Sequence, residues 1–132
     1  MTISCYVAAM KISLAAANQK FAIQAYEKGQ LIINQQAYCK NLILMPEQLI
    51  TDWRPQSIGD LTAADFDELL ALKPSMIILG TGEKQAFPSP ALYAEATNAG
   101  IGVEVMNTPA ACRTYNILMS EGRSIAAALM ML

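Results

Sequence analysis

The amino-acid sequence predicts a single-domain α/β protein that contains a βαβ unit. Its 132 residues are the usual size of one domain. Short apolar runs of strand length alternate with helical patterns in the second half, and no linker or low-complexity tract divides the chain. Met10 is an alternative start, so we treat residues 1–9 as a candidate disordered extension and residues 10–132 as the domain.

The first half of the chain predicts strands. Residues 20–26 and 30–34 are apolar-rich runs separated by a short segment with Gly29, a pattern typical of a β-hairpin. Residues 41–45 are nearly continuous apolar residues followed by a proline, which predicts another strand. Residues 46–60 mix proline, glycine and polar residues around the single tryptophan, and we expect a long surface connection there.

A first helix is predicted after this connection. Thr62 is a helix N-cap and Asp65, three residues later, approximates a capping box. Pro74 ends the helix. The residues spaced to face a core are Phe66, Leu69 and Leu70.

The βαβ unit follows directly. Residues 75–79 form a continuous apolar run that suits a strand buried on both faces. Ser89 and Pro90 then predict the start of a helix that ends at Gly100, and residues 102–106 form the partner strand. The two strands should be parallel and joined by a right-handed crossover.

The last third of the chain predicts one helix and one further element. Thr108 and Pro109 repeat the cap-then-proline start, and this helix runs to about Ser120. Residues 123–132 are compatible with a strand or a short helix. The short, fully apolar run favours a strand, while its alanine content favours a helix.

The carboxyl ends of the two parallel strands predict a cleft. Residues 80–82, Gly-Thr-Gly, follow one strand and residues 106–108 follow the other, so both loops should lie at the same edge of the sheet. The helix that begins at Thr108 offers unpaired N–H groups for an anion, and Arg113 can lean toward them. The candidate ligand-binding residues are Gly80, Thr81, Gly82, Asn107, Thr108, Cys112, Arg113 and Asn116.

Structural interpretations of the same residues stay open. The Gly-Thr-Gly run lacks the third glycine of a dinucleotide fingerprint, because Gln85 stands there, and is also compatible with a simple tight turn. Arg113 can pair with Glu104 or Glu83 and hold loops in place. Glu104 itself either faces a polar side of the sheet or is a buried carboxylate with a raised pKa.

The composition indicates no catalytic, metal or cofactor site. The chain has no histidine, which removes the commonest general base and most transition-metal ligands. Cys112, near a helix start, is a candidate thiolate, although a free cysteine is more often a small buried apolar residue. Cys5, Cys39 and Cys112 are widely spaced and odd in number, which fits neither a disulfide framework nor a zinc pattern. We therefore expect a reducing, cytoplasmic location.

Charge and hydropathy exclude two further classes of protein. Nine cationic and eleven acidic residues give a net charge of −2, and the cations are scattered, so no nucleic-acid surface is indicated. The longest apolar runs, such as residues 125–132, fall short of the roughly 20 residues that a membrane-spanning helix needs. The apolar first 18 residues lack a positively charged opening, so we expect no secretory signal. A charged share of only 15% predicts a homo-oligomer.

Residues 103–118 and 120–123, together with the Gly-Thr-Gly run at residues 80–82, resemble a family of domains of unknown function. The family includes the mitochondrial respiratory complex I assembly factor and an adipogenesis-associated domain protein. The resemblance covers about residues 10–132 and implies a three-layer fold with a mixed central β-sheet flanked by helices. For the mitochondrial member it implies a non-catalytic role in building NADH:ubiquinone oxidoreductase. The family usually has aspartate where Asn107 stands, so no role for a carboxylate is implied there.

These observations lead to competing functional hypotheses. The first is a non-catalytic interaction protein whose partners are other proteins, including subunits of a respiratory or other membrane complex. The alternative is a small-molecule or anion-binding protein, or an enzyme, that uses the cleft at the carboxyl ends of the parallel strands. A third hypothesis is a redox protein that uses Cys112.

Overall fold

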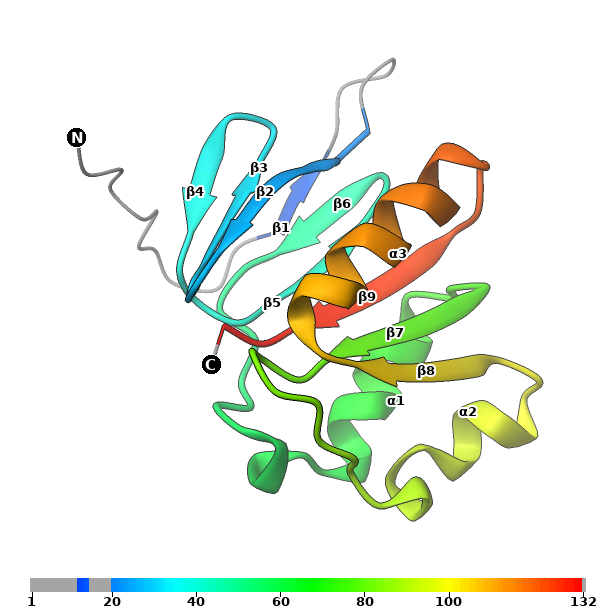
Figure 1. Cartoon of the computed structure of the whole chain (residues 1–132). Coiled ribbons are helices and arrows are strands. Elements are labelled where there is room, and N and C mark those ends of the chain that lie inside the picture. The colour runs from blue at the N-terminus through cyan, green and yellow to red at the C-terminus, as the bar shows by residue number, and fades with distance from the viewer. Residues whose placement is uncertain (1–11, 15–19, 132) are drawn as a thin grey trace.

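The structure of the protein is a computed structural model that describes residues 12–14 and 20–131 (Figure 1). The candidate extension, residues 1–9, lies outside the described residues. The strands are β1 (Ile12–Leu14), β2 (Ile23–Glu27), β3 (Gln30–Ile33), β4 (Gln36–Tyr38), β5 (Leu42–Met45), β6 (Gln48–Ile50), β7 (Met76–Gly80), β8 (Gly102–Met106) and β9 (Ile125–Leu129). The helices are α1 (Ala63–Ala71), α2 (Ala94–Asn98) and α3 (Thr108–Ser120), and η1 (Ile58–Asp60) and η2 (Pro90–Tyr93) are short 3-10 helices.

A mixed sheet of six strands forms the centre of the fold, in the order β1-β6-β5-β9-β7-β8. β7 runs parallel to both β8 and β9, whereas β5 runs antiparallel to β9 and β6. β2, β3 and β4 form a second, antiparallel sheet. The strands of the βαβ unit are parallel as predicted, and the last element is the predicted strand.

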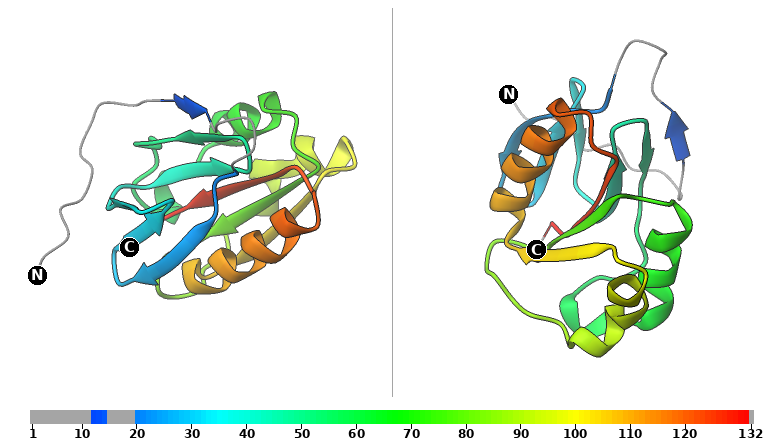
Figure 2. Two further views of the ribbon diagram at one scale, coloured as in Figure 1. Left: turned by 90° about the horizontal axis from the view of Figure 1, so that it is seen from above. Right: turned by 90° about the vertical axis from the view of Figure 1, so that its right-hand side faces the viewer.

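The elements form three layers, as the family resemblance implied (Figures 1 and 2). α3 and the three-stranded sheet cover one face of the central sheet, while α1 and α2 cover the other. Each face has its own apolar cluster. Tyr115 of α3 and Leu31 of β3 belong to the first, and Phe66 of α1 and Trp53 belong to the second. β9 runs between the clusters and is buried along its whole length.

Several local predictions are confirmed. The hairpin of β2 and β3 turns at Gly29, whose φ of +75° is a conformation that glycine adopts without steric cost. At α1 the carboxylate of Asp65 accepts a hydrogen bond of 2.9 Å from the backbone N–H of Thr62, as in a capping box. The helix of the βαβ unit begins at Ser89 and Pro90, first as η2 and then as α2.

The prediction of a long surface connection at residues 46–60 is wrong. This segment contains β6, and Trp53 is only 1% exposed. The backbone N–H of Trp53 donates to the carbonyl of Asn41 at 2.6 Å, which draws the segment inward. β4 was not predicted either. Three-residue strands carry too little periodicity to be recognised, and their position depends on pairing with β3 and β5.

Within the described residues, the helices are all too short or too polar to cross a membrane.

Candidate functional site

The carboxyl ends of β7 and β8 lie side by side, as the sequence predicted. The backbone N–H of Thr81 donates to the carbonyl of Met106 at 2.9 Å, and the N–H of Thr108 donates to the carbonyl of Gly82 at 2.7 Å. The loop after β7 is therefore joined directly to the start of α3.

Thr108 is the centre of this junction. Its hydroxyl donates to the carbonyl of Met130 at 2.7 Å and accepts from the N–H of Gly82 at 2.8 Å, and its side chain is completely buried. Gly80 leaves room for it, because a Cβ there would lie 3.0 Å from the Thr108 hydroxyl oxygen and 3.0 Å from a methyl group of Leu129. The Thr108 hydroxyl therefore joins the start of α3 to the loop after β7 and to the residue that follows β9, and it faces the interior.

The start of α3 differs from the prediction by one residue. Asn107, and not Thr108, is the N-cap: its side-chain oxygen accepts from the N–H of Ala110 at 2.9 Å. Pro109 has no N–H, and the N–H of Thr108 is bonded to Gly82. The backbone donors of residues 108–110 are thus absent or engaged, so the geometry offers them to no anion. An amide oxygen suffices for this cap, so the cap needs no carboxylate at residue 107.

The other candidate residues line a pocket between β2 and α3. This β2–α3 pocket has a volume of about 250 Å³. It is lined by Ile23, Gln24, Ala25, Tyr26, Pro109, Cys112, Arg113 and Asn116. The structure therefore brings Cys112, Arg113 and Asn116 together, and separates them from Thr81, Gly82 and Thr108. Sequence reasoning missed the four residues from β2, since nothing local indicates that this hairpin packs against α3.

Asn116 and Tyr115 attach β2 to the helix. The Asn116 amide donates to the carbonyl of Ile23 at 2.7 Å and accepts from its N–H at 3.0 Å. The Tyr115 hydroxyl donates to the carbonyl of Phe21 at 2.7 Å. Both polar atoms of the Asn116 amide are thus occupied by the backbone of one residue. Its role in the pocket is to shape the wall.

Arg113 is the exposed cation at the rim of the pocket. Among the described residues it forms no ion pair: Glu83, one of its expected partners, instead lies 3.5 Å from Lys28. Its other expected partner, Glu104, is exposed on β8, in agreement with the polar-face interpretation of that residue. The guanidinium is therefore free to meet a negatively charged group from outside.

Cys112 is buried beneath Arg113. Burial raises the pKa of its thiol to about 12, and the nearby charge of Arg113 lowers it by less than burial raises it. The thiol is therefore protonated at neutral pH, which is unfavourable for a nucleophile or redox centre.

Cys112 is a free cysteine, whereas Cys39 is disulfide-bonded. The spacing of the cysteines did not predict that bond, because separation along the chain says little about distance in the fold.

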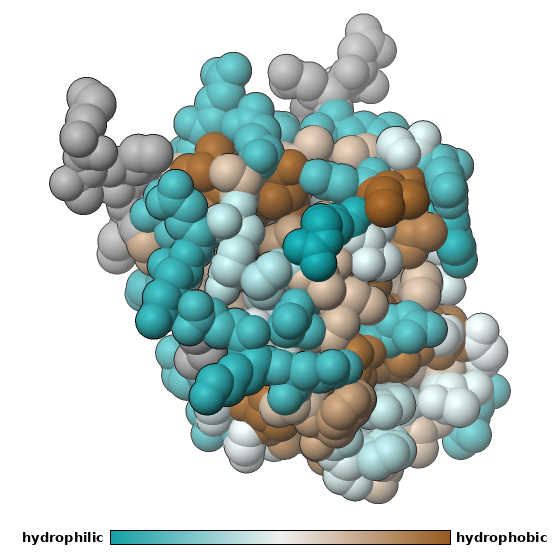
Figure 3. Space-filling view, viewed as in Figure 1, coloured by the Kyte–Doolittle hydropathy of each residue, from teal (hydrophilic) through white to brown (hydrophobic). Residues whose placement is uncertain are grey.

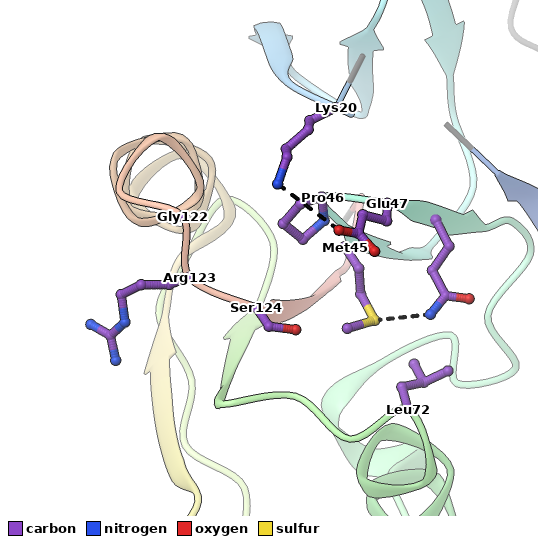
Figure 4. A pocket seen from close by; sticks show the side chains of 9 residues that line it. Lys20, Met45, Pro46, Glu47, Leu72, Gly122, Arg123 and Ser124 are labelled. Carbon is purple, nitrogen blue, oxygen red and sulfur yellow. Dashed lines mark hydrogen bonds and ion pairs between the residues drawn. The ribbon is translucent and has the colours of Figure 1, made fainter. Parts of the chain in front are cut away.

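Other pockets do not include Cys112, Arg113 or Asn116, but Thr81, another candidate residue, lines one of them. One of about 450 Å³ is largely apolar and lies between η1 and the loop after β7, with Ile58, Thr81 and Ala86 in its wall. Another pocket, of about 170 Å³, lies at the end of the sheet opposite to the carboxyl ends of β7 and β8 (Figure 4). There Lys20 and Glu47 form an ion pair of 3.9 Å, and Arg123 points away from it. Over the described residues no group of acidic or sulfur ligands is arranged to hold a metal.

The chain matches a family model described as a protein of unknown function, DUF498/DUF598, over residues 23–130. It is 34% identical over 102 residues to the 13 kDa major membrane protein of Francisella tularensis, covering 76% of this chain and 83% of that protein. It is 31% identical over 109 residues to the bovine NADH dehydrogenase [ubiquinone] 1 alpha subcomplex assembly factor 3, covering 81% of this chain. The match spans only 59% of the bovine protein and 62% of its human counterpart.

Solved structures share the fold. A crystal structure of a Bordetella parapertussis protein has a TM-score of 0.81 at 34% identity, covering 87% of this chain and 98% of that one. An NMR structure of a Xanthomonas campestris protein has a TM-score of 0.78 at 41% identity, covering 89% and 92%. A Bordetella pertussis protein described as a Mth938-like domain has a TM-score of 0.75 at 29% identity, covering 92% of each chain.

Proposed function

This chain belongs to the DUF498/DUF598 family of proteins of unknown function, and we propose that it is a non-catalytic interaction protein that helps to assemble a respiratory or other membrane complex. The observation that carries the proposal is the match to proteins named as assembly factors of NADH dehydrogenase over 81% and 86% of this chain. The relative named as a major membrane protein also favours an association with membrane components.

The chemistry of the described residues supports a non-catalytic role. The buried Cys112 thiol has a pKa of about 12, and the chain has no histidine to act as its base. The polar groups at the carboxyl edge of β7 and β8 bond to one another. Arg113 is exposed in the β2–α3 pocket and has no ion-pair partner among the described residues, and a guanidinium is suited to an acidic patch on a partner.

Self-association and a cytoplasmic location are parts of the same proposal. Phe87 is 74% exposed and Ile117 is 59% exposed, and apolar side chains are interspersed with hydrophilic ones on the face that carries α3 (Figure 3). The cytoplasmic location was predicted from the spacing of the cysteines, which suggested no disulfide framework. The disulfide at Cys39 argues against that location, because disulfides persist mainly in oxidising compartments. Cell fractionation decides between a reducing and an oxidising compartment.

The test is affinity capture from crosslinked native cells, followed by mass spectrometry. Wild-type protein should recover subunits of one membrane complex, and Arg113→Ala should recover fewer. Arg123→Ala is the matched control, because Arg123 is also an exposed arginine but lies at the opposite edge of the sheet. Recovery of no membrane-complex subunit by the wild type would contradict the proposal.

A second candidate function is the binding of a small carboxylate or phosphate in the β2–α3 pocket. The specific observation in its favour is Arg113, which has no ion-pair partner among the described residues and lies at the rim of a pocket of about 250 Å³. Titration with inorganic phosphate and with simple carboxylates, followed by NMR, tests it. Equal binding by wild type and Arg113→Ala would remove its basis.

A further inference from the structure

β8 is an edge strand of the central sheet. Among the described residues it pairs with β7 on one side and with no strand on the other. In the right-hand view of Figure 2 it faces the viewer, with no helix or strand drawn in front of it. Such an edge carries a row of backbone donors and acceptors that can pair with another chain.

Two contacts show which residues of β8 point outward. The carbonyl of Met106 accepts from the N–H of Thr81, which follows β7, so the backbone groups of residue 106 point toward β7. The carbonyl of Val105 instead accepts from the side-chain amide of Gln85 at 3.2 Å, on the outer side. Because backbone groups alternate in direction along a strand, Val103 and Val105 both present their N–H and C=O groups to the open edge.

The open edge is only lightly covered by the described residues. A Cβ added to Gly102 would meet no atom within 4 Å, so the face of the sheet above the start of β8 is open as well. Gln85 covers one carbonyl at the other end, and the side chain of Gln85 is exposed. One exposed side-chain contact can be replaced by a backbone bond at little cost.

The charge on β8 disfavours a second copy paired symmetrically about Glu104 and favours a partner strand that carries a basic residue. Glu104 lies exposed at the middle of the strand and forms no ion pair with any described residue. If two copies paired β8 with β8 antiparallel about this centre, their Glu104 carboxylates would face each other and repel. A strand with a lysine or arginine opposite Glu104 would instead gain a favourable cross-strand pair.

We propose that β8 binds an extended segment of a partner protein, which adds as a strand to the sheet and places a basic residue opposite Glu104. The N–H and C=O groups of Val103 and Val105 supply the backbone hydrogen bonds. The inference rests on the proposed function, because β8 would supply the contact through which an interaction protein holds its partner.

A library of random twelve-residue peptides displayed on phage is the probe. Selection against the wild-type protein should enrich peptides with a lysine or arginine among β-branched residues, and dissociation constants are then measured with the synthesised peptides. Val105→Pro removes one outward donor and should weaken binding at least about tenfold. Glu104→Lys leaves the backbone intact and should weaken binding by a similar factor at low salt.

One variant should act in the opposite direction. Gln85→Ala removes the side chain that competes for the carbonyl of Val105 and should strengthen peptide binding, by up to about fivefold. Glu95→Lys, an equal change of charge on the exposed surface of α2, should leave binding unchanged. Failure to enrich any peptide, or equal binding by wild type, Val105→Pro and Glu104→Lys, overturns strand addition.

Cell capture separates this failure from failure of the proposed function. If wild type and Glu104→Lys recover the same membrane-complex subunits, the assembly role stands and β8 is not the contact. If peptides bind β8 as described but no membrane-complex subunit is recovered, strand addition stands and the assembly role is wrong.

Discussion

Asn116 holds the backbone of Ile23 from both sides: its amide donates to the carbonyl at 2.7 Å and accepts from the N–H at 3.0 Å. The two residues are 93 positions apart, and this contact imitates the pairing between two strands. It attaches the three-stranded sheet to α3 and thereby forms one wall of the β2–α3 pocket.

Replacing Asn116 should therefore loosen the second sheet. We expect Asn116→Ala to lower the free energy of unfolding by about 1–3 kcal/mol, because both backbone groups of Ile23 lose their partner. Urea denaturation measures this loss. Asn98→Ala, a change in the exposed α2, is the control and should have a much smaller effect. A loss no greater than that of the control would contradict a structural role for Asn116.

Substitution of two glycines at strand ends should have different effects on stability. Gly80→Ala should destabilise the protein by about 1–3 kcal/mol, since the new Cβ would lie 3.0 Å from Leu129 and from the Thr108 hydroxyl. Gly102→Ala adds the same methyl group in open space and should change stability by less than about 0.5 kcal/mol. Thermal unfolding of the two variants compares them directly. Equal effects would show that the end of β7 is not closely packed.

Asp65 should make stability depend on pH in the acid range. Burial alone would raise the pKa of its carboxyl, but hydrogen bonds from Arg54 and Thr62 outweigh burial and lower that pKa below its ordinary value of 3.8. The stabilisation is therefore complete above that ordinary value, and it is lost as the pH falls toward the lower pKa of the folded protein.

The variant Asp65→Asn tests this dependence. It should be about 1–3 kcal/mol less stable than wild type at pH 7, because it loses the ion pair of 2.6 Å with Arg54 and weakens the cap of α1. The difference should shrink below about pH 4. Asp67→Asn, at an exposed position of the same helix, is the control. A difference that stays constant from pH 7 to pH 3 would rule out the linkage.

Cys112 should react slowly with alkylating reagents. With a pKa raised from 9.0 to about 12, its thiolate fraction at pH 7 is on the order of a thousandfold below that of an unperturbed thiol. Iodoacetamide labelling, followed residue by residue with mass spectrometry, should be fast only after unfolding in urea. Rapid labelling of the folded protein at pH 7 would restore the redox hypothesis.

Phe87 should contribute to self-association. It is 74% exposed and follows Ala86, which lines the apolar pocket beside η1. Sedimentation velocity of wild type should show an oligomer at high concentration that Phe87→Ser weakens. Ile117→Ser, on α3, tests whether a separate apolar side chain is responsible instead. A monomeric wild type at every concentration would end the proposal of a homo-oligomer.

Much of the fold follows from patterns within a few residues. The continuous apolar runs of β5 and β7 predicted buried strands, and the cap-then-proline pattern at Ser89 predicted the crossover helix. Patterns of this kind act locally, since burial of a short run and the capping of a helix depend on neighbouring residues. The short strand β6 escaped prediction because its burial depends on partners elsewhere in the chain.

The candidate site was only partly predictable. The sequence placed Arg113, Asn116 and Cys112 on one helix surface, and the structure finds all three in one pocket. It also grouped them with Thr81 and Thr108, whose hydroxyls bond inside the fold. A sequence does not reveal which polar group already has a partner, because hydrogen bonds such as that from Thr108 to Met130 join distant segments.

By itself, the sequence determined the α/β class, the parallel βαβ unit and the chemical types of residue available, including the absence of histidine. Only the tertiary structure decided that β9 lies between β5 and β7, that the hairpin of β2 and β3 packs beside α3, and that β8 is an open edge among the described strands. The physical reason is the separation along the chain of the residues that interact. Strand and helix formation depends on local periodicity, whereas sheet order, pockets and open edges depend on contacts between segments that are far apart in the chain.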